Sequence, residues 1–182
     1  SWSEPAYWQM GLFAGDWSAH WIGSAEMESQ SVGGRPVDNK MFDPWFRKTF
    51  TLTESLKEAL IYVASIGYQE LYVNGCKIGN AVLAPSVTDH KSRARYVTYD
   101  ISHYLKKGEN VIALWLGTSW AVFPAYQRND EPAIPMALAQ AEITLTSGSK
   151  VRVITDGSWK THASPNMLMG YWDAHHFAGE FY

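Results

Sequence analysis

Hydrophobic and polar residues alternate over several stretches between positions 45 and 162, which is the pattern of half-buried β-strands. In the first stretch, Phe46, Phe50 and Leu52 alternate with polar residues, so one face of this strand is predicted to be buried. Further runs of β-branched and aromatic residues predict strands at residues 60–66, 70–73, 76–78, 96–100, 137–146, 151–155 and 159–162. No segment has the period of a long amphipathic helix.

Turn-forming residues separate these runs. Asn74-Gly75 stands between two apolar runs, and it predicts a β-hairpin because both central residues of such a turn adopt positive φ. Residues 101–108 predict one helical turn, capped at its start by Asp100 or Ser102. Residues 110–116, NVIALWL, are almost continuously apolar, which predicts a central strand buried on both faces.

About eight short strands without a long helix predict an all-β fold, an antiparallel β-sandwich or jelly roll. Two segments lie outside the strand pattern. Residues 1–23 combine tryptophan, tyrosine, proline and glycine without a period, and are predicted to be a leading aromatic segment. Residues 24–44 have the composition of a loop. The predicted domain therefore covers residues 24–182.

Composition and charge narrow the possible functions. Aromatic residues make up 14% of the 182 residues, which suits both strand packing and sugar binding. The net charge of -3 provides no basic surface for nucleic acid, and no apolar run is long enough to span a membrane. Cys76 is the only cysteine, so no internal disulfide can form, and its side chain is expected to be a small buried one.

The connection after Leu116 is the main candidate for a binding site. It has about twenty residues and three prolines, and loops of this length inside a domain are usually functional or mobile. Trp120 or Tyr126 could stack on the apolar face of a sugar, and Arg128, Asn129 or Asp130 could bind its hydroxyl groups. Alternatively, Trp120 closes the end of the sandwich.

Catalytic and transition-metal sites find little support in the sequence. Glycoside hydrolysis needs two carboxyl groups on either side of the scissile bond. The possible pairs are Asp130 with Glu131, Asp173 with Glu180, and Glu54 with Glu58. The first pair would point apart on an extended chain, and the last reads as exposed turn residues. His175 and His176 lack a third metal ligand at a diagnostic spacing.

Several stretches, in this order, resemble the N-terminal β-sandwich domain of bacterial α-L-rhamnosidases, a carbohydrate-binding-module-like domain with a galactose-binding-domain-like fold. They are WSEPAYWQMGL, DWSAHWIG, WFRKTFTL, YVASIGYQELYVNGCKIGNAVLAPSVTDH, RYVTYDISHYLKKGENVIALWLGTSW, ALAQAEI, ITDGSWK and GEFY. The first of them also resembles the end of a fibronectin-type module that precedes this domain in such enzymes.

The resemblance implies two further properties. The catalytic (α/α) barrel of these enzymes would follow this domain in the parent chain. In some members the sandwich binds L-rhamnose with calcium, and the resemblance carries those ligands over to Asn80, Asn129 and Asp130. Asn80 is flanked by glycine and alanine, where a full site would have an acid. The alternative is that these Asn and Asp residues only stabilise turns.

Three hypotheses follow. The chain is a non-catalytic accessory domain that supports the barrel and binds L-rhamnose or a related sugar; or it is a purely structural inter-domain module; or it is a self-sufficient glycosidase. Its expected partners are a rhamnose-containing glycan, the barrel and neighbouring β domains of the same chain, and neither nucleic acid nor membrane. No cofactor other than calcium is implied, and the compartment stays open.

Overall fold

The computed structural model describes residues 2–6, 8–24, 31–32, 35–36, 43–90, 92–117, 134–165, 167–169 and 179–181. Its longer strands are β4 (Pro44–Leu52), β5 (Leu56–Ile66), β6 (Tyr68–Val73), β8 (Tyr96–Asp100), β9 (Gly108–Gly117), β10 (Met136–Leu145) and β11 (Lys150–Ile154). The shorter ones are β1 (Ile22–Gly23), β2 (Ser31–Val32), β3 (Arg35–Pro36), β7 (Cys76–Lys77), β12 (Lys160–Ala163), β13 (Met167–Met169) and β14 (Gly179–Phe181). Two 3₁₀ turns are η1 (Ala14–Asp16) and η2 (Ser102–Tyr104).

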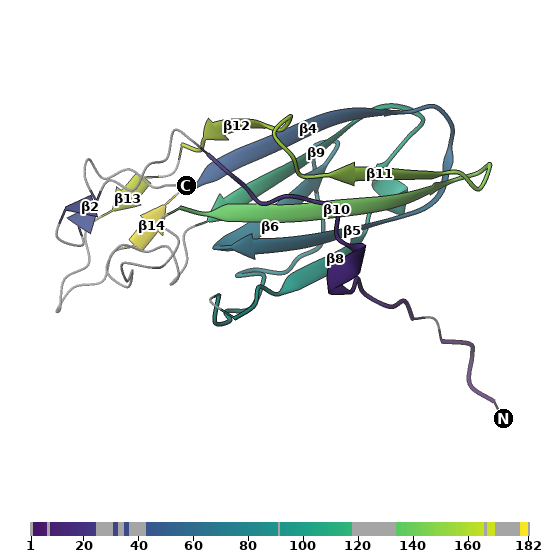
Figure 1. Ribbon diagram of the computed structural model, residues 1–182, viewed down its shortest axis with the longest axis horizontal. Helices are drawn as coiled ribbons and strands as arrows, with labels where there is room; N and C mark the ends of the chain where they lie inside the picture. The colour runs from purple at the N-terminus through teal and green to yellow at the C-terminus, as the bar shows by residue number, and fades with distance from the viewer. Residues whose placement is uncertain are drawn as a thin grey trace.

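The strands form two five-stranded antiparallel sheets (Figure 1). The first sheet has the order β1-β10-β5-β8, and β11 also pairs with β10. The second sheet has the order β12-β4-β9-β6-β7. The pairs β2–β3 and β13–β14 are separate two-stranded ribbons. The predicted all-β sandwich is confirmed.

The core lies between the two sheets, where alternate residues of each strand point inward. Phe46, Leu71 and Leu114 come from the second sheet and Ile61 and Ile143 from the first, and each is at most 2% exposed. Burial of such side chains contributes about 1.5–3 kcal/mol each to folding, before the entropic cost of ordering them. Hydrophobic alternation thus specifies which face of each strand joins the core.

Most predicted elements appear at the expected positions. The strand at residues 96–100 is β8, and the turn between β6 and β7 has positive φ at Asn74 (49°) and Gly75 (84°). The predicted helical turn is η2, and the Asp100 carboxylate accepts a hydrogen bond of 2.9 Å from the Ser102 amide. Strand β5 begins four residues before the predicted residue 60 because Leu56 already pairs with Leu145.

Three expectations were wrong. Strand β9 is buried on one face only, because the opposite face, with Ala113 and Trp115, lies on the outside of the sandwich. Cys76 is exposed rather than buried, since it follows the hairpin turn on a two-residue edge strand. The stretch at residues 24–44, predicted to be a loop, contains the paired strands β2 and β3 and the start of β4.

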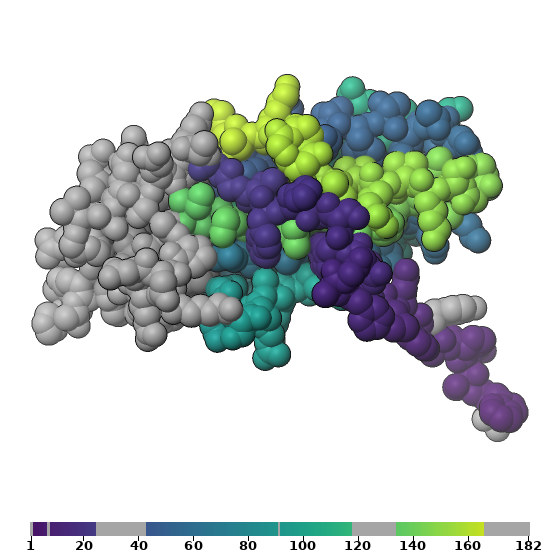
Figure 2. All heavy atoms as spheres, in the orientation of Figure 1, coloured from purple at the N-terminus to yellow at the C-terminus, as the bar shows by residue number. Residues whose placement is uncertain are grey.

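Residues 11–23, which we call the strap, cover part of the outer face of the first sheet. The Trp17 ring meets those of Tyr62 and Tyr96 edge to face, with centroids 6.4 and 5.5 Å apart. The Tyr96 hydroxyl also donates a hydrogen bond of 3.1 Å to the Leu12 carbonyl. Figure 2 shows the strap, in purple, lying across the green surface of β10.

Two fully buried polar side chains attach the strap to the sheet. The Gln140 amide accepts from the Ser18 N–H (2.7 Å) and donates to the Asp16 carbonyl (2.9 Å). The Thr155 hydroxyl donates to the His20 carbonyl at 2.7 Å. Whether the domain begins at residue 24 stays a prediction, although β1 at residues 22–23 pairs with β10. No helix in the described ranges has the length and hydrophobicity needed to cross a bilayer.

Candidate functional site: an aromatic pocket on the second sheet

The outer face of the second sheet carries a pocket built from three neighbouring strands. In the register of these strands Trp45 of β4 lies opposite Trp115 of β9. Two residues away along β9, Ala113 lies between Arg47 of β4 and Tyr72 of β6. Directly opposite residues project from the same face of an antiparallel sheet, so these five side chains stand together.

The small side chain of Ala113 leaves the centre of this group open. The pocket has a volume of about 340 Å³, and Trp45, Arg47, Tyr72 and Trp115 line its sides. The two indole rings meet edge to face, with centroids 5.6 Å apart and planes at 84°. Trp45 is 40% exposed, so part of its side chain remains accessible to solvent. We call this feature the aromatic pocket.

An ordered polar group stands on the β6 side of the aromatic pocket. The Glu70 carboxylate accepts a hydrogen bond of 2.7 Å from the Tyr72 hydroxyl and pairs with the Lys77 ammonium. Burial alone raises the pKa of Glu70, but the hydrogen bonds from Lys77 and Tyr72 and the charge of Lys77 outweigh burial and lower it. This group holds the Tyr72 ring in place and is charged at neutral pH.

The chemistry of the aromatic pocket suits a ligand with both apolar and polar surfaces. Indole and phenol rings offer flat apolar area, and a few polar groups at the rim fix the orientation of what binds. Saccharides have such a composition, since their C–H faces are apolar and their edges carry hydroxyl groups. This set of side chains is therefore suited to binding a ligand of that kind.

A second, polar pocket of about 280 Å³ lies between the strap and the first sheet. Of its carboxylates, Glu142 accepts hydrogen bonds from Arg152 (2.6 Å) and Gln140 (2.8 Å), so it has a structural role. Glu58 is also in this pocket, on strand β5 and not in a turn as the sequence suggested. Glu54 does lie in the bend between β4 and β5.

The sugar-binding residues predicted after Leu116 fall on a part of the chain that the structure does not describe; they are Trp120, Tyr126, Arg128, Asn129 and Asp130. The same holds for Glu131, Asp173, His175, His176 and the side chain of Glu180. Asn80 is described: it is exposed and follows Gly79, which has a positive φ of 76°. In the described ranges no three His, Cys, Asp or Glu side chains are placed to hold a metal. Calcium binding through Asn80, Asn129 and Asp130 stays a prediction.

Sequence reasoning missed the residues of the aromatic pocket, although one signal for them was present. Phe46, Phe50 and Leu52 occupy the inner face of β4, so Trp45 had to lie on the otherwise polar outer face. A tryptophan at such a position is a candidate for binding. Trp115 gave no such signal, because it lies in the continuous apolar run of β9.

Comparison with known proteins places the chain among parts of glycoside hydrolases. Residues 54–182 match the family model described as the alpha-L-rhamnosidase N-terminal domain. The chain is 30% identical over 167 residues to an alpha-L-rhamnosidase of Formosa agariphila, an alignment that covers 88% of the chain and 18% of that protein.

Solved structures of alpha-L-rhamnosidases are also similar to the chain. The alpha-L-rhamnosidase of Dictyoglumus thermophilum is similar with a TM-score of 0.70 and 30% identity, over 85% of the chain and 17% of that structure. The enzyme of Aspergillus terreus has a TM-score of 0.71 and 29% identity, over 86% and 18%. The chain therefore spans about a fifth of the length of these proteins.

Proposed function

The chain belongs to the family of α-L-rhamnosidase N-terminal domains, and on that premise we propose that it is the non-catalytic accessory domain of an α-L-rhamnosidase, binding saccharide at the aromatic pocket. The parent enzyme would remove rhamnose from rhamnose-containing glycans. The accessory domain would hold such a glycan near the catalytic part, which we place in the remaining four-fifths of the parent's length, outside the part that this chain matches.

The aromatic pocket is the observation that carries this proposal. Trp45 exposes 40% of its surface beside the partly exposed Trp115, and neighbouring aromatic side chains on an outer sheet face are a candidate interaction surface. A sugar stacked on Trp45 would bury more of its ring, and Arg47, an exposed residue that lines the pocket, can donate hydrogen bonds to hydroxyl groups at the rim. Such shallow sites typically bind a single sugar unit weakly, with Kd values on the order of millimolar.

The side chains of the pocket also support a non-catalytic role. Hydrolysis of a glycosidic bond needs an acid and a second carboxylate on opposite sides of it. Among the described residues, the pocket walls include neither Asp nor Glu. The nearest acid along β6, Glu70, is engaged by Lys77 and Tyr72.

Calorimetric titration with methyl α-L-rhamnoside tests the proposal. We expect weak saturable binding to the chain, and at least tenfold weaker binding to Trp45→Ala because the stacking surface is lost. Trp21→Ala is the matched control: Trp21 is 42% exposed but lies outside the pocket, so its removal leaves the affinity unchanged. Equal binding by the chain and Trp45→Ala, or release of nitrophenol from a nitrophenyl rhamnoside by the chain alone, would contradict the proposal.

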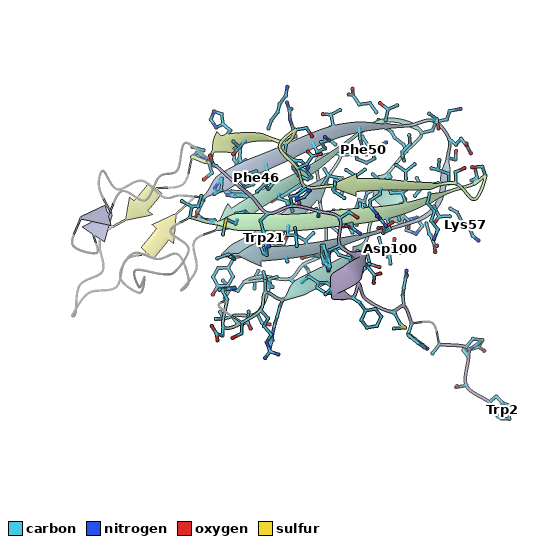
Figure 3. The ribbon with its side chains drawn as sticks, viewed as in Figure 1. Trp2, Trp21, Phe46, Phe50, Lys57 and Asp100 are labelled. Carbon is cyan, nitrogen blue, oxygen red and sulfur yellow. The ribbon has the colours of Figure 1, made fainter. Side chains whose placement is uncertain are left out.

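A second function, docking against other parts of the parent enzyme, is favoured by the exposed residues before and at the beginning of the strap. Trp2, Trp8 and Phe13 are 101%, 82% and 65% exposed, and Figure 3 shows Trp2 at the tip of the extended N-terminal segment. Large apolar side chains in water commonly mark interaction surfaces. If docking is the whole function of the chain, the titration gives no binding heat at millimolar sugar.

A further inference from the structure

We propose that the aromatic pocket prefers an anionic saccharide, one that carries a carboxylate or a sulfate ester, over a neutral one. This inference rests on the proposed saccharide binding and names the class of sugar that the site selects. It follows from the charges that the strand register places beside Trp45.

Two cations stand side by side at the β4 edge of the pocket. Arg47 lines the pocket, and the register of β12 with β4 places Lys160 directly opposite it. Two residues further along β12, His162 lies opposite Trp45, and their ring centroids are 6.5 Å apart. Arg47, Lys160 and His162 are all exposed, so a bound ligand could reach them.

In the part of the chain that the structure describes, this pair of cations has no acid as an ion-pair partner. Within the described ranges neither Arg47 nor Lys160 has a carboxylate at ion-pair distance, whereas Lys48, Lys77 and Arg152 each have one. The acid on the far side of the pocket, Glu70, already pairs with Lys77. Among the described residues, no acid therefore neutralises the positive charge at the β4 edge, in a chain whose net charge is -3.

Like charges directly opposite each other on neighbouring strands destabilise a sheet. An anion bound between Arg47 and Lys160 would remove this repulsion, so its affinity includes the relief of an unfavourable interaction. The planar guanidinium of Arg47 can bind a carboxylate or a sulfate through two parallel hydrogen bonds. The sugar ring that bears the anion would meanwhile lie on the exposed part of Trp45.

Matched pairs of ligands test this preference. The first pair is methyl β-D-glucuronide and methyl β-D-glucoside, which differ only in a carboxylate at the sixth carbon. The second is methyl α-L-rhamnoside with and without a sulfate ester. We expect the anionic member of at least one pair to bind about fivefold tighter at low salt, the gain of one exposed ion pair. Which pair shows the effect distinguishes carboxylate from sulfate.

Substitutions assign the effect to the two cations. Arg47→Gln and Lys160→Gln are expected to bring the ratio of the affinities for the anionic and the neutral ligand close to one. Added salt should lower this ratio in the unmodified chain, because ions screen exposed charges. Lys57→Gln is the control, since Lys57 is an exposed lysine of the first sheet (Figure 3). Retention of the preference in Arg47→Gln would overturn the assignment to this site.

The possible failures differ from one another. Equal affinity for the anionic and neutral members of both pairs, with binding still lost in Trp45→Ala, overturns the anionic preference and leaves the proposed function standing. The absence of binding by all four ligands, or binding that Trp45→Ala leaves unchanged, overturns both.

Discussion

At the residue scale, Gly67 shows how closely the backbone is packed where the chain passes from the first sheet to the second. Gly67 has a φ of 100°, and a Cβ atom added to it would lie 2.5 Å from the Gly117 carbonyl oxygen. Gly148 has a similar φ of 87°, but a Cβ atom there would have no neighbour within 4 Å. The two positions share a backbone conformation and differ in available space.

We therefore expect Gly67→Ala to reduce the free energy of unfolding much more than Gly148→Ala. The positive φ costs about 1–2 kcal/mol at both positions, because a side chain is disfavoured in that conformation. At Gly67 the added methyl group must also displace the backbone of β9. Denaturant unfolding of both variants measures the difference. Equal losses would show that the contact with Gly117 relaxes without cost.

At the element scale, the strap is the segment that the periodicity of the sequence did not show to be attached to the sandwich. Its backbone is held by the buried side chains of Gln140 and Thr155, and its Trp17 ring packs on Tyr62 and Tyr96. The described residues before Gly11, 2–6 and 8–10, are exposed. The strap thus acts as part of the sandwich, while the residues before it contribute little to its stability.

Two truncations and one substitution test whether the strap, and not the residues before it, stabilises the sandwich. Removal of residues 1–10 should change the free energy of unfolding by less than about 0.5 kcal/mol, as for other exposed positions. Trp17→Ala should cost about 2 kcal/mol, because a half-buried ring is lost. Removal of residues 1–23 should be more damaging still, since it deprives Gln140 and Thr155 of their partners. If this last variant is as stable as the full chain, the domain does begin at residue 24.

At the scale of the whole molecule, titratable groups define a pH range of maximum stability. Burial raises the pKa of Tyr62, with smaller effects of Glu142 and Tyr96, and it raises the pKa of Tyr99 despite a hydrogen bond from Gln69. A raised pKa means that the unfolded chain loses its proton first. Stability is therefore expected to fall as the pH rises above about 10.

On the acid side, burial lowers the pKa of His90, partly opposed by the charge of Asp89. The unfolded chain then binds a proton before the folded one, so stability should fall as the pH drops below about 6.5. A second fall is expected below about pH 4, because three carboxylates also have lowered pKa values. They are Glu70, Asp100 and Asp156.

Denaturant unfolding as a function of pH checks this profile, with a plateau expected between about pH 7 and pH 9.5. His90→Gln should remove the first acid decline, because it removes the proton uptake on unfolding, and should leave the second. A decline between pH 7 and pH 5 of the same size in His90→Gln would mean that another group is responsible.

The sequence by itself determined the strands, their turns and the fold class. Alternation and the Asn-Gly hairpin signal are local properties, so they survive without knowledge of neighbouring strands. The resemblance to rhamnosidase N-terminal domains was also present in the sequence, and the family comparison confirmed it. The predicted sugar-binding and calcium residues stay predictions, since all but Asn80 lie outside the described ranges.

Only the tertiary structure decided which surfaces are open and which side chains meet on them. Alternation tells the two faces of a strand apart, but it does not show what covers the outer one. The strap covers part of the outer face of the first sheet, whereas Trp45 and Arg47 are exposed and Trp115 is partly exposed on the outer face of the second. The pairing of β12 with β4, which places Lys160 beside Arg47, joins segments far apart in the chain. Such neighbours depend on strand order and register, which the whole core sets and no local pattern encodes.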